Sequence, residues 1–204
     1  SAQKLLSMRA WLLRSQAKPA LALLCAGPAC WLLYAALQDH LGPNPAEALI
    51  RGTGDWTLRA LCLVLAVTPL RVLTRTPALA RFRRLLGLNV FVYATLHLLC
   101  YAWLDMGLDL PDIARDIAKR PFILVGFAAM VLLSLLAATS FQRAVRWLGA
   151  KRWQVLHRAV YAVACLAILH FYWMRAGKQD FAEVAVYATV LGLLLGWRVW
   201  HARR

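Results

Sequence analysis

The hydrophobic positions of this 204-residue chain gather into long continuous runs instead of alternating with polar positions. Six runs approach the roughly 20 residues that a helix needs to cross a bilayer. They fall at 19–37, 56–73, 85–104, 121–140, 157–174 and 181–200. Backbone polar groups in hydrocarbon must find partners within their own segment, which favours helices. The pattern predicts an all-α, polytopic membrane helical bundle with about six transmembrane helices.

Polar sequence is confined to the ends of the chain and to short connections. We therefore predict an N-terminal cytoplasmic segment at 1–18, a six-helix transmembrane domain at 19–200 and a cytoplasmic tail at 201–204. In the sixth run, Gly192 and Gly196 have the G-x-x-x-G spacing, a weak indication of a close helix contact.

The composition supports a lipid environment. Hydrophobic residues make up 62% of the chain and charged residues 16%, whereas soluble domains carry about 25% charged residues. The five cysteines lie in apolar stretches and form no C-x-x-C pair. Neither a disulfide framework nor a thiol redox motif is predicted, and we interpret the cysteines as small core residues.

The basic residues are distributed unevenly between the two sides of the predicted membrane domain. With the N-terminus inside, 17 of the 24 Lys and Arg fall on the cytoplasmic side, and all nine Asp and Glu fall on the other. The Lys/Arg bias predicts that both termini are cytoplasmic. A net charge of +15 would suggest nucleic acid in a soluble protein. Here topology and attraction to anionic membrane lipids account for it, so no nucleic-acid partner is predicted.

The ionisable side chains inside the predicted spans are histidines: His97 in the third run, and His157 and His170 in the fifth. No Asp or Glu lies well inside any predicted span, which excludes the carboxylate relays of many pumps and transporters. His97 and His170 both fall in the outer half of their helices. Two imidazoles facing each other across a bundle suit the axial positions of a haem. The alternative, neutral histidines hydrogen-bonded between helices, stays open.

The spacing separates the roles of these histidines. His157 and His170 are thirteen residues apart, which is about 19.5 Å along one continuous helix and about 140° around it. These two cannot share a haem. His97 and His170 are therefore the predicted iron ligands. A second haem at the inner level would need a ligand near Arg83, and arginine is a poor ligand.

A second group of residues is predicted at the cytoplasmic ends of these helices: Arg83, Arg84, Trp153 and His157. Arginine forks bind phosphate bidentately, and an indole can stack on a flat ring. Together they would suit a flavin nucleotide. The alternative is that the arginines follow the positive-inside rule and Trp153 belongs to an aromatic belt.

Several short stretches resemble the MsrQ (YedZ) family of ferric-reductase-like transmembrane proteins. They are RRLLGL at 83–88, YATLH at 93–97 and WQVLH at 153–157, followed by His170, together with GPNP at 42–45 and TPLR at 68–71. The resemblance covers most of the chain. It implies a bacterial inner-membrane protein, for which the Lys/Arg bias predicts both termini in the cytoplasm.

The resemblance also implies cofactors and partners. Such proteins take electrons from a cytoplasmic flavin reductase or from quinol. They pass them through b-type haem to a periplasmic molybdopterin enzyme that reduces methionine sulfoxide. The family's histidines would map to His97, His157 and His170, and its FMN site to Arg83, Arg84 and Trp153.

The leading hypothesis is a transmembrane electron conduit, an electron-transfer subunit without catalytic residues of its own. The chain has no G-x-G-x-x-G nucleotide fingerprint, so it needs a separate donor and acceptor. One alternative is a free-standing ferric or quinone reductase, which differs in its acceptor. Another is a cofactor-free membrane assembly or transport protein, which would be colourless when purified.

Overall fold

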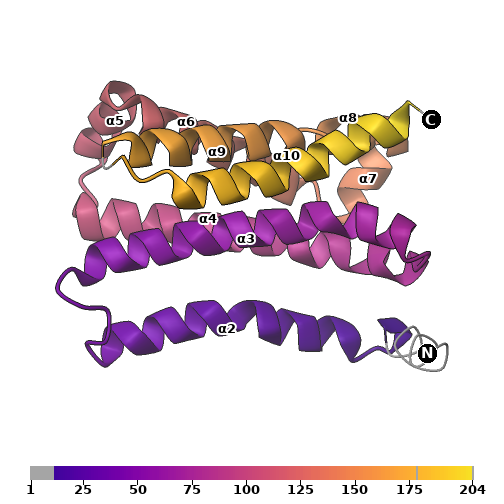
Figure 1. The fold of residues 1–204 in the computed structure, drawn as a ribbon, viewed down its shortest axis with the longest axis horizontal. Helices are drawn as coiled ribbons and strands as arrows, with labels where there is room; N and C mark the ends of the chain where they lie inside the picture. The colour runs from indigo at the N-terminus through magenta and orange to yellow at the C-terminus, as the bar shows by residue number, and fades with distance from the viewer. Residues whose placement is uncertain (1–11, 178, 204) are drawn as a thin grey trace.

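A computed structural model describes residues 12–177 and 179–203, and all regular structure in this part of the chain is helical (Figure 1). Six stretches are long and apolar enough to cross a membrane. The prediction of an all-α membrane bundle with six spans is confirmed. The long helices are α2 (Ala17–Leu37), α3 (Pro45–Leu73), α4 (Arg83–Cys100), α6 (Pro121–Ala138), α9 (Val160–Ala176) and α10 (Ala182–Ala202).

Shorter elements join these helices: a 3-10 helix η1 (Pro77–Phe82), a π-helical turn η2 (Tyr101–Asp105), α5 (Leu110–Lys119), α7 (Gln142–Leu148) and α8 (Ala150–His157). Of the predicted N-terminal segment at 1–18, residues 1–11 lie outside the described part. Helix α10 continues to Ala202, into the predicted tail.

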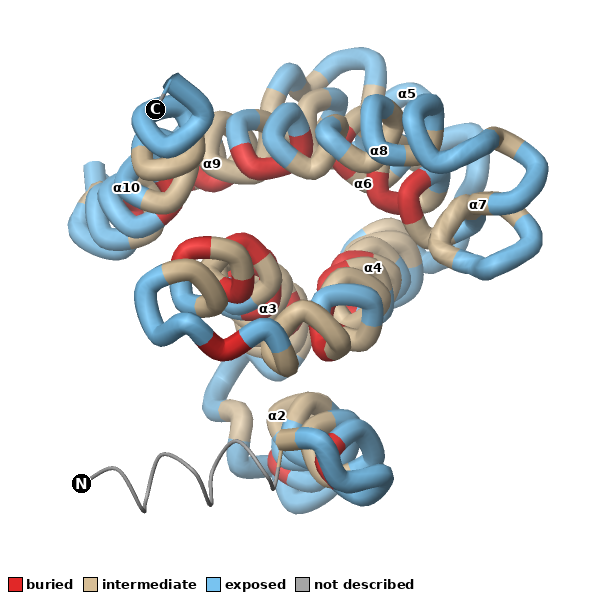
Figure 2. The backbone as a smooth tube through the Cα atoms, turned by 90° about the vertical axis from the view of Figure 1, so that its right-hand side faces the viewer, coloured by how far each residue is buried: buried red, intermediate tan, exposed pale blue. Residues whose placement is uncertain are grey.

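The long helices lie side by side in three layers (Figure 2). Helix α2 forms one layer, α3 and α4 form the middle one, and α6, α9 and α10 form the third. Helix α3 packs along α4, and α6 packs along α9. Leu61, Val90 and Val163 are almost completely buried in a core cluster between the middle and third layers. This core holds the two helix pairs together.

Helix α3 begins eleven residues before the predicted start of the second span. Asn44 caps it, because its Oδ1 accepts a hydrogen bond from the Glu47 N–H at 3.1 Å, and Pro45 occupies the first turn. The polar residues Arg51 and Asp55 lower the hydropathy of this segment without preventing a helix. Asp55 therefore lies well inside α3, and the prediction that no carboxylate lies well inside a span was wrong.

The predicted fifth span is interrupted. Helix α8 ends at His157, and α9 begins at Val160. The Ala159 and Tyr161 N–H groups donate to carbonyls three residues back, each at 3.0 Å, which tightens the turn between the two helices. His157 and His170 therefore belong to different helices, and the expectation of one continuous helix was wrong.

The acid-rich connection before α6 contains the unpredicted short helix α5. The Asp109 carboxylate caps it by accepting the Asp112 N–H at 2.9 Å. After the helix, the Arg120 guanidinium forms an ion pair with Asp116. Hydrogen bonds from Arg120 hold the pKa of Asp116 below its usual value.

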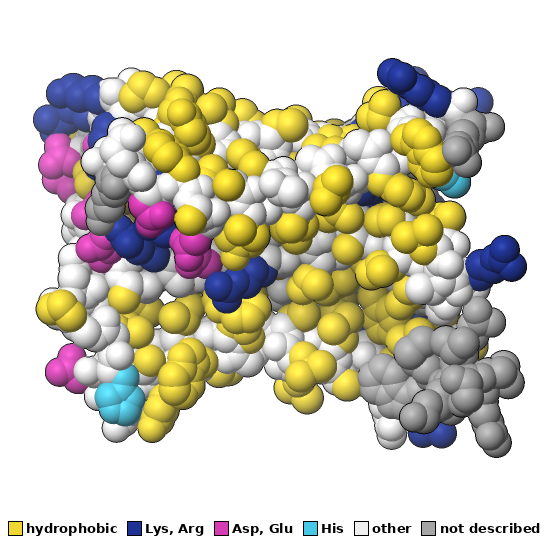
Figure 3. All heavy atoms as spheres, viewed as in Figure 1, with side chains coloured by type: hydrophobic (Ala, Val, Ile, Leu, Met, Phe, Trp, Pro, Cys, Tyr) yellow, Lys and Arg dark blue, Asp and Glu magenta, His cyan; other side chains and the backbone are white. Residues whose placement is uncertain are grey.

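The charged side chains distinguish the two ends of the bundle. The start of α2 and the end of α10 lie at the same end, together with α7 (Figure 1). Acidic side chains gather at the opposite end, on the left of the view in Figure 3. We call this the acidic end and the other the terminal end.

A tyrosine hydroxyl joins α2 to the middle layer. The Ala29 N–H donates to the Tyr93 hydroxyl at 3.0 Å, and that hydroxyl donates to the Cys25 carbonyl at 2.7 Å. In a regular helix the Ala29 N–H would donate directly to the Cys25 carbonyl. Here the Tyr93 hydroxyl is inserted between these two groups, next to Pro28. The buried Tyr93 anchors a helix that otherwise contacts the bundle little.

Two packing predictions do not match the structure. Apart from their chain neighbours and the backbone of α10 itself, no described atom lies within 4 Å of a Cβ built on Gly192 or Gly196, so their spacing marks no contact with another helix in this bundle. Cys30 and Cys165 are exposed at the helix surface, so the prediction that the cysteines are core residues was wrong for these two. In a membrane protein the outer surface faces lipid, so an apolar position is no guarantee of burial.

A half-buried arginine, Arg198, compensates for a proline in α3. Pro69 has no N–H, so the Leu65 carbonyl lacks its regular helical donor. Arg198 of α10 donates one guanidinium N–H to that carbonyl and another to the Leu194 carbonyl at 2.8 Å. Arg198 therefore ties α10 to α3, besides adding to the positive charge of the terminal end.

We expect Arg198→Met to destabilise the protein by about 1–3 kcal/mol, because the Leu65 carbonyl would lose its partner inside the bundle. Arg203→Met, which removes the same charge from the exposed end of the chain, should have little effect. Thermal unfolding of both variants in the same detergent measures the difference. Equal unfolding temperatures would contradict this role for Arg198.

Candidate functional site

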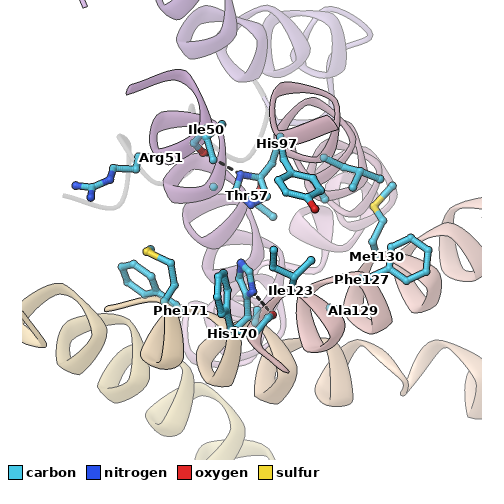
Figure 4. Close-up of a pocket in the computed structure, with 18 of the residues that line it drawn as sticks. Ile50, Arg51, Thr57, His97, Ile123, Phe127, Ala129, Met130, His170 and Phe171 are labelled. Atoms are coloured by element: carbon cyan, nitrogen blue, oxygen red, sulfur yellow. Dashed lines mark hydrogen bonds between the residues drawn. The ribbon is translucent and has the colours of Figure 1, made fainter. Parts of the chain in front are cut away.

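A cavity of about 550 Å³ opens between the α3–α4 pair and the α6–α9 pair (Figure 4). Its volume lies in the range of small-molecule and cofactor sites. The lining is largely hydrophobic, and Leu61, Val90 and Val163 of the core contribute to it. Small residues from all four helices widen it: Gly54, Ala94, Gly126, Ala129 and Ala167. A flat, mostly apolar ligand suits this space.

His97 of α4 and His170 of α9 meet in this cavity. Their ring centres are 6.1 Å apart, and the ring planes form an angle of 79°. Metal–imidazole bonds are about 2 Å long, and a ring nitrogen lies about 1 Å from the ring centre. A metal held between two imidazoles therefore needs ring centres roughly 6 Å apart, which is the observed separation.

Both histidines are held through the same ring nitrogen. His97 Nδ1 donates to the Ile50 carbonyl at 2.8 Å, and His170 Nδ1 donates to the Phe122 carbonyl at 2.6 Å. A carbonyl only accepts, so the proton of each neutral imidazole resides on Nδ1. The Nε2 lone pairs are then available to a metal, the usual arrangement for histidine ligands.

The acidic end of the cavity carries charged groups that the sequence did not single out. Arg175 is buried, and its two terminal nitrogens contact Asp180 at 3.3 Å and Glu183 at 2.5 Å. Its Nε has no hydrogen-bond partner among the described residues. Arg175 and Asp55 line the same cavity as the histidines. The unpaired Nε–H group of Arg175 can donate a hydrogen bond to an acceptor atom of a bound ligand.

These features fit a haem better than a bare metal ion. Within residues 12–177 and 179–203, no three His, Cys, Asp or Glu side chains gather as metal-ion ligands. Two opposed imidazoles, small residues around a flat space and an unpaired Arg175 donor match an iron porphyrin with its carboxylate groups. Gly54, Gly126, Asp55 and Arg175 were missed because nothing in their sequence spacing relates them to a histidine on another helix.

The inner histidine has different neighbours. Trp153 stacks on His157, with ring centres 4.0 Å apart and planes inclined by 26°. The Trp153 indole donates to the Thr139 carbonyl at 2.8 Å, and His157 Nε2 lies 3.0 Å from the Thr139 hydroxyl. Thr139 at the end of α6 thus fixes both rings. His157 does not line the cavity of His97 and His170.

Arginines surround this inner pair without acidic partners. Arg83 interacts electrostatically with His157 and with Arg198, and Arg84 lies over the Phe141 ring at 5.4 Å. Both Arg83 and Arg84 are exposed. Among the described residues, neither forms an ion pair. The structure therefore brings Arg83, Trp153 and His157 into one region and places Arg84 beside it.

The two groups are well separated. Arg83 and His97 are fourteen residues apart in α4, which is about 21 Å along the helix. The core cluster between them consists of buried apolar residues.

The matches with known proteins all indicate the same family. Residues 53–168 match the family described as ferric reductase like transmembrane component. A protein of Polaromonas naphthalenivorans is 66% identical over 94% of this chain and 87% of its own length. A relative from Bordetella parapertussis is 57% identical over 82% of this chain and 82% of its own length. A relative from Ralstonia nicotianae is 54% identical over 89% of this chain and 84% of its own length.

All three relatives bear the name protein-methionine-sulfoxide reductase heme-binding subunit MsrQ. No solved structure matches the chain. The extent and identity of these matches show that the chain belongs to the MsrQ family of ferric-reductase-like transmembrane proteins.

Proposed function

We propose that this protein carries electrons across the membrane through one b-type haem, as the haem-binding subunit of a protein-methionine-sulfoxide reductase system. The observation that supports this most strongly is the opposed pair His97 and His170. Their ring centres are 6.1 Å apart, and each Nδ1 is bound to a backbone carbonyl. The name shared by the close relatives agrees with such a site.

The residues of the cavity have distinct tasks in this proposal. When bound, haem supplies a one-electron redox centre whose potential depends on its axial ligands, burial and nearby charge. His97 and His170 would hold the iron through their Nε2 atoms. Leu61, Val90 and Val163 exclude water from the side facing the terminal end. The Nε–H of Arg175, which has no partner among the described residues, would donate to a carboxylate of the cofactor.

At the terminal end we assign Arg83, Arg84 and Trp153 to FMN. The exposed arginines have no ion-pair partners among the described residues, so their forks can bind a phosphate. Trp153 is half-buried and offers an aromatic ring for stacking. His157 orients that indole, since the two rings stack at 4.0 Å. The electron donor is a cytoplasmic flavin reductase or quinol.

The direction of transfer follows from orientation. We place the terminal end in the cytoplasm and the acidic end in the periplasm of a bacterial inner membrane, because Lys and Arg favour the cytoplasmic side. The haem cavity then lies near the periplasmic side. Its electrons would pass to a periplasmic molybdopterin-dependent methionine sulfoxide reductase.

This orientation predicts the behaviour of topology reporters. A reporter fused after Arg204, or inserted in the 141–152 connection, should be active only as a cytoplasmic marker. A reporter in the 105–120 connection should be active only as a periplasmic marker. The reason is that 17 of the 24 Lys and Arg residues fall on the side assigned to the cytoplasm. A periplasmic C-terminus would overturn both the orientation and the direction of transfer.

Electron transfer can be tested with the purified protein in liposomes. A flavin reductase with its reductant is enclosed inside, and the periplasmic reductase with oxidised methionine peptide is added outside. We expect haem reduction followed by peptide reduction, both absent from liposomes that lack this protein. Equally fast reduction of an added ferric chelate or quinone without the partner would favour a free-standing reductase instead. A colourless preparation would favour an assembly or transport protein.

A further inference from the structure

Two glycines lie directly against the histidines of the cavity. A Cβ built on Gly126 would lie 2.7 Å from Nδ1 and 2.9 Å from Cε1 of His170. A Cβ built on Gly54 would lie 3.1 Å from Cε1 and 3.2 Å from Nδ1 of His97. The first distances are too short for any side chain without movement, and the second are tight. Both imidazoles therefore occupy space that alanine would fill.

The same arrangement occurs twice, on unrelated helices. His97 donates to the carbonyl of Ile50, and Gly54 follows four residues later in α3. His170 donates to the carbonyl of Phe122, and Gly126 follows four residues later in α6. Residues four apart lie one above the other on the same helix face. Each glycine thus opens the helix surface beside the carbonyl that accepts the Nδ1–H bond.

Backbone conformation does not explain these glycines. Neither has a positive φ, so neither occupies a conformation that favours glycine. In a helix interior, glycine is about 1 kcal/mol less favourable than alanine. What distinguishes both positions is the imidazole packed on the bare backbone.

We propose that Gly54 and Gly126 are positioning residues for the axial histidines. Each forms, with the carbonyl one turn before it, a notch that holds one imidazole by its Nδ1–H group and fixes its ring plane. The notch directs Nε2 toward the iron and stops the ring from turning. This inference rests on the proposed haem function and gives two of the small residues of the cavity a role in holding the histidine rings.

The two notches differ in tightness, which predicts a graded effect. In Gly126→Ala, the His170 ring must move away from α6, which breaks its bond to Phe122 and displaces Nε2. Loss of such an outer partner reduces metal affinity by about 10- to 100-fold. In Gly54→Ala, a shift of a few tenths of an ångström suffices. We expect that variant to keep its haem with a changed ring orientation.

The test compares haem binding in four alanine variants of the full-length protein. Gly126→Ala and Gly54→Ala are measured beside Gly27→Ala and Gly192→Ala, two helical glycines with nothing within 4 Å of the Cβ position. The readouts are the haem-to-protein ratio, the rate of haem loss to apomyoglobin and the ferric electron paramagnetic resonance spectrum. The spectrum reports the orientation of the two imidazole planes, which a general loss of stability would not change.

We expect faster haem loss in Gly126→Ala, a shifted resonance spectrum in Gly54→Ala and wild-type behaviour in both controls. If Gly126→Ala does not accumulate, the spectrum of Gly54→Ala alone tests the positioning role. The positioning role would be overturned if Gly54→Ala had the spectrum and the rate of haem loss of the wild type, and if any Gly126→Ala that accumulates were also unchanged. The haem proposal would still stand in that case. Absence of haem from the wild type would instead defeat the proposed function itself.

Discussion

Replacing His97 or His170 by alanine should abolish the b-type haem absorbance of the purified protein or reduce it severely. Each substitution removes one axial ligand, together with the hydrogen bond that joins its helix to the carbonyl of Ile50 or Phe122. No other described histidine lines the cavity, so none can replace the lost ligand. The visible spectrum of membranes and of purified protein at equal protein concentration measures the effect.

Matched controls come from the histidines at the ends of the bundle. His201 stacks on Trp197 with ring centres 4.8 Å apart, and His40 lies beside Tyr34 at 6.2 Å. Neither lines the cavity. His40→Ala and His201→Ala should keep the full spectrum. Complete haem retention in both His97→Ala and His170→Ala would defeat the assignment of the axial ligands.

The double substitution Arg83→Ala/Arg84→Ala should remove bound flavin and leave the haem absorbance unchanged. Removal of the guanidinium groups takes away the charge-assisted bonds to the phosphate. The haem is spared because Arg83 is about 21 Å along α4 from His97, beyond a packed apolar core. Reduction of the haem by the flavin reductase should slow, whereas dithionite should still reduce it fully.

The control for this experiment removes two other arginines from the terminal end. Arg143 and Arg146 of α7 are also exposed, and Arg143→Ala/Arg146→Ala lowers the net charge equally. Flavin content is measured by fluorescence after the protein is denatured. Equal flavin loss in both double variants would indicate a general charge effect, and loss of haem with the flavin would contradict two separate sites.

The helices and the pairing of His97 with His170 could be predicted from the sequence, because both depend on residue type and on depth along a helix. Continuous apolar runs specify membrane spans, and two histidines in the outer halves of different helices can meet at one level. The 6.1 Å separation of their rings agrees with that prediction. Their role as iron ligands is a proposal for experiment.

The errors arose where local hydrogen bonds or contacts between helices decide the outcome. The polar start of α3 is helical because Asn44 caps it, yet its hydropathy is too low to mark a span, so Asp55 was placed outside the membrane. The break after His157 depends on two backbone hydrogen bonds, which leave no compositional signal. The glycines beside the imidazoles act on residues of other helices, a relation that only the fold reveals.

The haem-to-protein ratio of the wild-type protein, measured together with that of His157→Ala, tests whether the chain binds a single haem between His97 and His170. His157 Nε2 lies 3.0 Å from the Thr139 hydroxyl and outside the cavity, so it is not needed for the iron. We expect one low-spin haem per chain in the wild type and the same ratio in His157→Ala. A colourless wild type, or a ratio near two that the substitution halves, would contradict it.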